Sequence, residues 1–210
     1  MLEIRWHARG GQGAKTASQA LALAALAEGF YVQAFPEYGP ERSGAPMKAF
    51  NRIAGERIKI HYNIYNPDIV VVVDDSLLDS ESVDVTEGLR PDGVLLVNTR
   101  LSAEEVRKKT GFTGQVLTLD ADRIAKEKGC RFANVPLLGA LARVIDLPLE
   151  RLQEEIKGLL GKKFAEKVVQ ANLDCLAAGY EALGEVQPAF PLAEERKEKE
   201  RERKGVHAGA

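Results

Sequence analysis

Apolar and polar residues follow two different patterns in the first 120 residues, and both predict strands. Residues 2–7 alternate between apolar and polar side chains, which is the period of a half-buried strand. Residues 69–75 instead begin with an unbroken apolar run, which is typical of a strand buried on both faces in a parallel sheet. Strands are predicted at residues 2–7, 31–35, 47–53, 56–62, 69–75, 93–98 and 115–119.

Apolar residues recur at helical spacing in the segments between and after these strands. The first such segment is rich in alanine, which has the highest helix propensity and is small enough to pack closely on a sheet. Ser102 and Glu105 are placed to form a capping box, and Pro136 and Pro148 stand where helices can start. Helices are predicted at residues 14–28, 102–110, 120–128, 135–145, 149–160 and 162–183.

Strands that alternate with helices, followed by a helical last third, predict the fold class. The first strand, helix and second strand are expected to form a parallel pair with a right-handed crossover. Ala54 and Gly55 are expected to turn a hairpin between residues 47–53 and 56–62. The prediction is an α/β protein with three layers: a Rossmann-like, doubly wound, mostly parallel sheet with an added antiparallel hairpin and a helical C-terminal part. Residues 1–186 are expected to form this single domain, and residues 187–210 a linker and a charged tail.

Length and charge narrow the possible partners. The chain has 210 residues, 45% hydrophobic and 29% charged, as in an ordinary globular protein with one sizeable core. Its net charge is −2, and its basic residues form no stripe with interleaved aromatics, which argues against nucleic acid as a partner. No apolar run is long enough to span a bilayer and no signal peptide opens the chain, so we expect a cytoplasmic protein that does not insert into a membrane.

The cysteines and histidines give no sign of a metal site. Cys130 and Cys175 form no CxxC pair, and two thiolates are too few for an iron–sulfur cluster. We expect both to be free thiols in a reducing compartment. His7, His61 and His207 lack carboxylates or cysteines at ligand spacing, so structural or exposed roles are expected for them.

A glycine loop joins the first predicted strand to the first predicted helix. Glycines there permit positive φ angles and a close approach of backbone N–H groups, and a helix start favours an anion. We therefore predict that this loop binds an anion or a cofactor phosphate, although a tight turn that needs glycine only for packing stays open. The loop consists of Gly10, Gly11, Gln12 and Gly13.

Two familiar nucleotide-binding fingerprints do not fit this loop. Ala14 stands where a phosphate loop requires lysine, and Thr16 stands where the dinucleotide fingerprint requires its third glycine. Glu37, after the second predicted strand, lies about where an acid that binds ribose is expected. Glu37 is the best argument for a nucleotide.

A second unusual segment, residues 36–46, is too rich in proline and glycine for a helix or a strand. It leaves the carboxyl end of the second predicted strand, where doubly wound sheets bind ligands. Its charged residues are expected either to form an ion pair that shapes the site or to present Arg42 to a phosphate or carboxylate. A solvated surface turn is the alternative. The candidate residues in this segment are Glu37, Tyr38, Glu41, Arg42 and Gly44.

Read together, the two segments resemble the gamma subunit, or gamma domain, of the pyruvate and 2-oxoacid:ferredoxin oxidoreductases. The family's first loop ends in Gly-Gly-Gln-Gly, and its second signature reads Tyr-Gly-x-Glu-x-Arg/Ser-Gly-Ala. Ala8 departs from a glycine that is common in the family. The matching stretches here are Ala8-Arg9-Gly10-Gly11-Gln12-Gly13 and Tyr38-Gly39-Pro40-Glu41-Arg42-Ser43-Gly44-Ala45. The resemblance extends over about residues 1–182.

The resemblance implies a subunit of an enzyme that oxidatively decarboxylates a 2-oxoacid to acyl-CoA and reduces ferredoxin. Thiamine diphosphate, Mg²⁺ and [4Fe–4S] clusters would then lie on partner chains, namely alpha, beta and ferredoxin-like delta subunits, with ferredoxin as the electron acceptor. This chain would have no catalytic residue of its own. The two segments would help to assemble or shape the substrate or coenzyme A end of the site.

Two other classes of function stay open on the sequence. One is a stand-alone Rossmann-type nucleotide-binding protein, or a dehydrogenase that uses NAD or a flavin; the missing third glycine counts against it. The other is a scaffold subunit with no ligand of its own.

Overall fold

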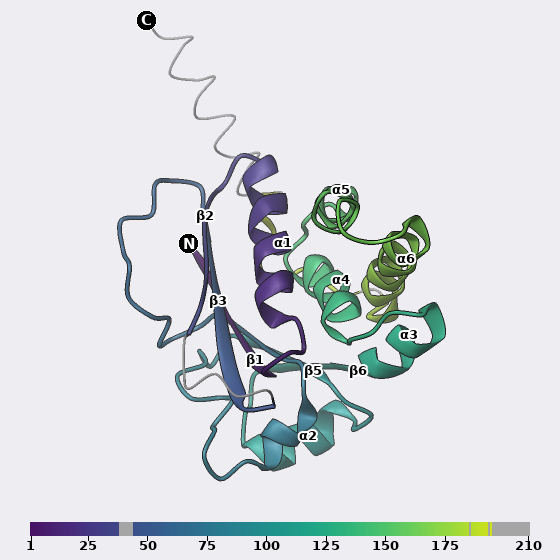
Figure 1. Ribbon diagram of the computed structural model, residues 1–210. Coiled ribbons are helices and arrows are strands. Elements are labelled where there is room, and N and C mark those ends of the chain that lie inside the picture. Colours follow the sequence, from purple (N-terminus) through teal and green to yellow (C-terminus); the bar gives the residue numbers. More distant parts are fainter. Residues whose placement is uncertain (38–43, 185, 193, 195–210) are drawn as a thin grey trace, which may run out of the picture.

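The computed structural model describes residues 1–37, 44–184, 186–192 and Glu194, and its elements are arranged in layers around one sheet (Figure 1). The strands are β1 (Leu2–Arg9), β2 (Tyr31–Pro36), β3 (Pro46–Ala54), β4 (Ile69–Val72), β5 (Val94–Asn98) and β6 (Gln115–Leu119). The helices are α1 (Ala14–Ala27), the short 3₁₀ helix η1 (Asp75–Asp79), α2 (Ala103–Thr110), α3 (Ala121–Lys128), α4 (Asn134–Val144), α5 (Leu149–Leu160) and α6 (Glu166–Ala182).

The sheet has the order β2-β3-β1-β4-β5-β6 and is mixed. Strands β1, β4, β5 and β6 run parallel, whereas β3 pairs antiparallel with β1 on one side and with β2 on the other. The predicted fold class is therefore confirmed. The predicted parallel pairing of the first two strands is wrong, because β3 inserts between them: its last six residues are all buried, as a central position requires, while β2 stays partly exposed at the edge.

The expected hairpin around Ala54 and Gly55 is also absent. Residues 56–62 follow β3 but pair with no strand in the described part of the chain. The antiparallel partners of β3 are β1 and β2, which occupy both of its hydrogen-bonding edges. The strand predicted at residues 56–62 is therefore wrong, because alternation along the chain cannot reveal whether a partner strand exists.

Two apolar cores lie on the two faces of the sheet. On one face, α1 and the C-terminal helices α3 to α6 cover Trp6 and the inward residues of β4 and β5. On the other, α2 and η1 cover the alternate residues of β4 and β5, with Val106 and Leu77 fully buried. Figure 1 shows α2 on the side of the sheet away from α1, α4, α5 and α6. None of the helices in the described ranges combines the length and apolar character needed to cross a membrane.

The cysteines differ from the expectation. Cys130, just after α3, forms a disulfide with Cys175 on α6, so the prediction of two free thiols is wrong. The separation of 45 residues concealed the pairing, because only the packing of α3 against α6 brings the two sites together.

The chain after α6 returns to the core. Leu192 is buried, and the N–H groups of Ala189 and Leu192 donate to the carbonyl oxygens of Val144 and Ile145 at 2.9 and 3.0 Å. The division of the chain at residue 186 stays a prediction.

Candidate functional site

The glycine loop lies where the order of the parallel strands reverses. The chain leaves β1 through this loop and enters α1, which leads to the β2 edge, whereas the neighbouring β4 continues toward β5 and β6. Such a switch point opens a crevice at the carboxyl ends of the strands, where doubly wound proteins bind ligands. The residues that follow β4, Asp74 and Asp75, face the loop across this crevice.

The Gln12 side chain holds the glycine loop in shape. Its Oε1 accepts a hydrogen bond from the backbone N–H of Arg9 at 2.8 Å, and its Nε2 donates to Oδ2 of Asp74 at 2.6 Å. Gly11, between them, has a φ of 94°, a conformation that L side chains rarely adopt. Gln12 therefore bridges the ends of β1 and β4 through its side chain.

Asp74 is the centre of a polar cluster. Its Oδ1 accepts from the N–H and the hydroxyl of Ser76 at 3.1 and 2.5 Å, and Arg9 lies 3.5 Å from its Oδ2. Burial alone would raise the pKa of Asp74, but the hydrogen bonds from Ser76 and Gln12 and the charge of Arg9 outweigh it and hold that pKa below the ordinary value. Asp74 is thus ionised at neutral pH and fixes one side of the crevice.

Gly13 forms the start of α1 and admits no side chain. Its φ is 81°, and a Cβ atom there would lie 2.6 Å from Nδ2 of Asn134, which donates to the Gly13 carbonyl oxygen at 3.1 Å. Asn134 opens α4, 121 residues away in sequence. The glycine is therefore required both for its backbone conformation and for close approach of α4.

The two segments singled out in the sequence meet in space. The N–H of Gly10 donates to the carbonyl oxygen of Ala45 at 2.8 Å, and the N–H of Gly44 donates to the carbonyl oxygen of Gly10 at 3.1 Å. Arg9 adds a bond from Nη1 to the Gly44 carbonyl oxygen at 3.2 Å. Glu37 is exposed at the end of β2, where its N–H donates to the carbonyl oxygen of Lys48. Tyr38, Glu41 and Arg42 lie outside the described residues.

Two further polar residues, Asn98 and Thr99, bond to carboxylates that line the crevice, and sequence reasoning assigned them no role. Thr99 donates to Asp75 at 2.9 Å, and Asn98 donates to Asp122 at 2.9 Å while its Oδ1 accepts from the N–H of Ala121 at the start of α3. The available signal was their position in the sequence, because polar residues at or just after the carboxyl ends of two buried parallel strands lie at the same edge of the sheet.

The crevice itself is small. Its cavity holds about 140 Å³, less than the ~300 Å³ typical of sites that enclose an organic ligand. Three carboxylates and one guanidinium reach its wall, so this part of the site can hold a small polar group but cannot enclose a dinucleotide. The lining residues are Gln12, Val73, Asp74, Asp75, Asp122, Arg131, Phe132 and Ala133.

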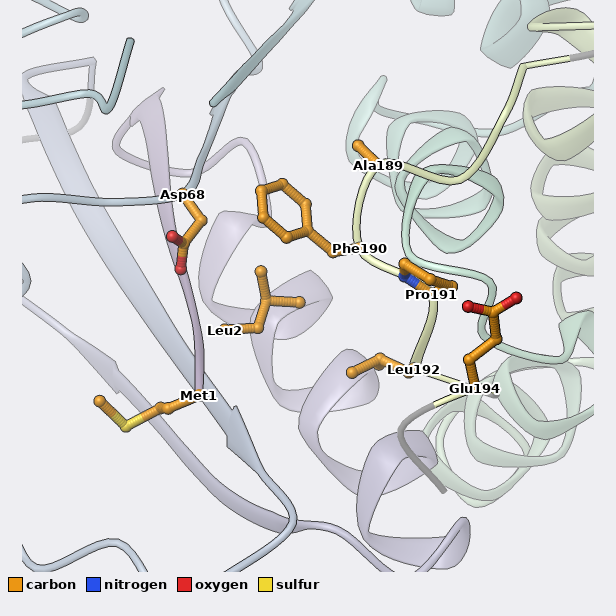
Figure 2. A pocket seen from close by; sticks show the side chains of 8 residues that line it. All are labelled: Met1, Leu2, Asp68, Ala189, Phe190, Pro191, Leu192 and Glu194. Atoms are coloured by element: carbon orange, nitrogen blue, oxygen red, sulfur yellow. The ribbon is translucent and has the colours of Figure 1, made fainter. Parts of the chain in front are cut away.

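A larger cavity of about 350 Å³ lies at the amino ends of the same strands, away from the glycine loop. Figure 2 shows Asp68 and Leu2 on one side of it and the segment with Phe190 and Pro191 on the other. The Asp68 carboxylate accepts a hydrogen bond from the N–H of Glu3 and forms an ion pair with Arg90. Its interactions therefore stabilise the start of the sheet and are not available to a ligand. No residue predicted from the sequence as part of the site lines this cavity.

Comparisons with known proteins agree on one family. The family profile described as pyruvate ferredoxin/flavodoxin oxidoreductase matches residues 3–182. The chain is 55% identical to the pyruvate synthase subunit PorC of Thermotoga maritima, over 85% of this chain and 93% of the relative. It is 50% identical to the pyruvate/ketoisovalerate oxidoreductases common subunit gamma of Thermococcus kodakarensis, over 81% of this chain and 95% of the relative. The crystal structure of the Thermotoga maritima subunit PORC superposes with a TM-score of 0.75 at 50% identity, covering 86% of this chain and 95% of that one.

Proposed function

This chain belongs to the pyruvate ferredoxin/flavodoxin oxidoreductase family as a gamma subunit of the pyruvate/2-oxoacid type, and we propose that it acts in its complex without catalytic residues of its own. Its role is to shape the end of the shared site that receives coenzyme A or another anionic group. The stand-alone nucleotide-binding or dehydrogenase alternative has no support from the relatives.

The backbone pairing between Gly10 and residues 44–45 carries this proposal. It joins the glycine loop to the second segment, so a group bound by one is within reach of the other. Gln12 and Asp74 hold the loop from the opposite side, and the start of α1, with its partial positive charge and no side-chain cap, follows the loop directly. The binding surface would comprise Gly10, Gly11, Gln12, Gly13, Glu37, Tyr38, Glu41, Arg42 and Gly44.

Partner subunits would supply the chemistry. Decarboxylation of a 2-oxoacid develops a carbanion that needs an electron sink, and no standard side chain provides one, whereas thiamine diphosphate does. Among the described residues, His, Cys, Asp and Glu form no group that could hold a metal ion. Thiamine diphosphate, Mg²⁺ and [4Fe–4S] clusters are therefore assigned to alpha, beta and delta partners, with ferredoxin as the acceptor.

Reconstitution tests this role. The purified chain should reduce neither ferredoxin nor a viologen dye with pyruvate or 2-oxoglutarate, with or without thiamine diphosphate. Mixed with its partner subunits it should form a stable complex, and leaving it out should lower turnover. Reduction of dye by the chain alone, or stoichiometric binding of a nicotinamide at the glycine loop, would contradict the proposal.

Arg42→Ala tests the assigned surface within that complex. Loss of a charge-assisted hydrogen bond costs about 1.5–3 kcal/mol, so the KM for coenzyme A should rise by about tenfold or more while kcat changes little. Arg107→Ala, on the exposed face of α2, is the matched control and should leave KM unchanged. An unchanged KM in the fully assembled Arg42→Ala complex would remove Arg42 from the surface without affecting the assignment of the chain to its complex.

A further inference from the structure

Residues 56–62, between β3 and β4, have the sequence of a strand but no strand to pair with in the described part of the chain. Apolar Ile58 and Ile60 are partly buried, and the residue between them is exposed, so the alternation is also present in the structure. Residues 57–61 contain no helix, turn or bend. Figure 1 shows the connection from β3 to β4 as a loop that runs outside the sheet.

Among the described residues, hydrogen bonds fix this segment to the body of the protein on one side. Nε2 of Gln33 donates to the Ile60 carbonyl oxygen at 2.8 Å, and Nη2 of Arg52 donates to the Tyr62 carbonyl oxygen at 2.7 Å. In an extended chain, the backbone groups of residues i and i+2 point to the same side and those of the residue between them to the opposite side. The N–H and C=O groups of Lys59 and His61 therefore face away from the sheet, and they form no hydrogen bond with the described residues.

The side chain of Arg52 holds the segment in a fixed position. Its side chain is fully buried, it binds Glu3 at 2.7 Å through Nε and Gln33 at 3.1 Å through Nη1, and its guanidinium lies 5.2 Å from the centre of the Tyr62 ring. A buried guanidinium with all of these partners is not a mobile surface contact. The outward backbone groups of Lys59 and His61 are therefore held in a defined position in which they can form hydrogen bonds with another strand.

Apart from Glu56 at its start, the exposed side chains on this edge are basic or aromatic. Arg57, Lys59 and His61 are exposed at alternate positions, and Tyr62 and Tyr65 follow with exposed fractions of 59% and 66%. Cross-strand neighbours on one face stabilise a pair when their charges are opposite and destabilise it when they are alike. A second copy of this chain, paired antiparallel through the same residues, would place Lys59 beside basic side chains, so an acidic strand fits and a second copy does not.

We propose that residues 56–62 are a docking edge for an extended strand from another subunit of the complex, with acidic side chains at alternate positions. The strand would add to residues 57–61 by main-chain hydrogen bonds, and its carboxylates would face Arg57 and Lys59. The docking edge rests on the proposed function within a multi-subunit complex, and it adds the surface and the chemistry by which one partner is recognised.

Hydrogen–deuterium exchange tests the edge directly. In the isolated full-length chain, the amides of Lys59 and His61 should exchange rapidly, and in the reconstituted complex they should slow by at least about tenfold. Failure of the complex to form would count against the proposed function. A complex that forms while these amides stay fast would overturn the docking edge alone. If the isolated chain forms a dimer in which the same amides are protected, the strand that docks comes from a second copy of this chain. That result would also overturn the proposal.

Variants separate the backbone contribution from the charge contribution. Lys59→Pro removes an outward N–H and should weaken assembly by about tenfold, the equivalent of one hydrogen bond, whereas Lys59→Ala retains the N–H and should weaken it less. The double reversal Arg57→Glu with Lys59→Glu should slow assembly most strongly at low salt. Lys162→Glu with Lys163→Glu, an equal change in charge on the exposed turn after α5, is the control and should have no effect. Equal effects of the two double variants would overturn the charge assignment, and equal melting temperatures of all four proteins would exclude misfolding as the cause.

Discussion

At the scale of single residues, three buried polar side chains on β1 and β3 distinguish this part of the sheet from an ordinary apolar face. Arg5, His7 and Arg52 are each almost fully buried, and each has a hydrogen-bond partner. Arg5 donates from Nε to Nε2 of His7 at 2.9 Å and from Nη2 to the carbonyl oxygens of Val85 and Glu87. The bonds from the two arginines join loops of the described chain to the sheet.

His7 makes the stability of the fold depend on pH. Burial, and then the charges of Arg5 and Lys48, lower the pKa of His7 to about 3, so the folded protein holds this imidazole neutral. The unfolded chain takes up a proton near its ordinary pKa of 6.5. Stability is therefore complete above pH 6.5 and falls between pH 6.5 and 3 by at most about 1.4 kcal/mol per pH unit.

His7→Gln tests this dependence. Glutamine offers an oxygen to Arg5 but does not titrate, so the variant should lose less stability between about pH 7 and 5 than the parent protein. Urea unfolding at several pH values measures the difference. Parallel pH profiles for the two proteins would show that His7 is not the titrating group.

At the scale of elements, the C-terminal helices pack so closely that two of them meet at glycines. A Cβ atom on Gly139 of α4 would lie 2.0 Å from the carbonyl oxygen of Leu176, and one on Gly179 of α6 would lie 1.9 Å from that of Pro136. This contact fixes α4, whose first residue, Asn134, holds the Gly13 carbonyl. Helix packing far from the crevice thus positions one of its walls.

Gly179→Ala should therefore destabilise the protein although alanine is the better helix former. Overlap with backbone atoms forces the helices apart, and overpacking of this kind typically costs about 1–3 kcal/mol or more. Gly158→Ala, in the interior of α5 with nothing within 4 Å of the added carbon, is the matched control. It should stabilise by about 0.5–1 kcal/mol. Thermal unfolding of both variants measures the difference. Equal melting temperatures of the two variants would contradict the close contact between α4 and α6.

At the scale of the whole molecule, the C-terminal segment closes one edge of the core. Phe190 and Leu192 pack against the large apolar cluster, and three backbone bonds join residues 189–192 to the end of α4. The predicted boundary between folded domain and dispensable tail can be tested on either side of this segment.

Two truncations make that test. A chain cut after Leu192 should keep the melting temperature of the full protein, because the acidic and basic residues of the tail offer no apolar face. A chain cut after Gln187 loses the burial of Leu192, worth about 1.5–3 kcal/mol, and should melt several degrees lower. A lower melting temperature for the chain cut after Leu192 would show that the tail docks on the protein.

Local signals in the sequence determined most of the elements. The capping box of Ser102 and Glu105 is present at the start of α2, and the bounds of α5 and β6 agree with their predicted ranges. These features depend on residues a few positions apart, so periodicity and capping chemistry suffice to predict them. The resemblance of the two motifs to one family was likewise recognised from short stretches of consecutive residues.

Only the tertiary structure decided which strands are neighbours and which polar groups meet. The bond from Gln12 to Asp74 and the bond from Asn134 to Gly13 join residues 62 and 121 positions apart, and the insertion of β3 between β1 and β2 reverses a local expectation. Strand order is set by which apolar faces can be buried together. The alternation at residues 56–62 does not show whether another strand of the chain pairs with them. The sequence by itself therefore determined the elements and the family, whereas the arrangement of the crevice and the free edge of residues 56–62 depended on long-range packing that no local pattern encodes.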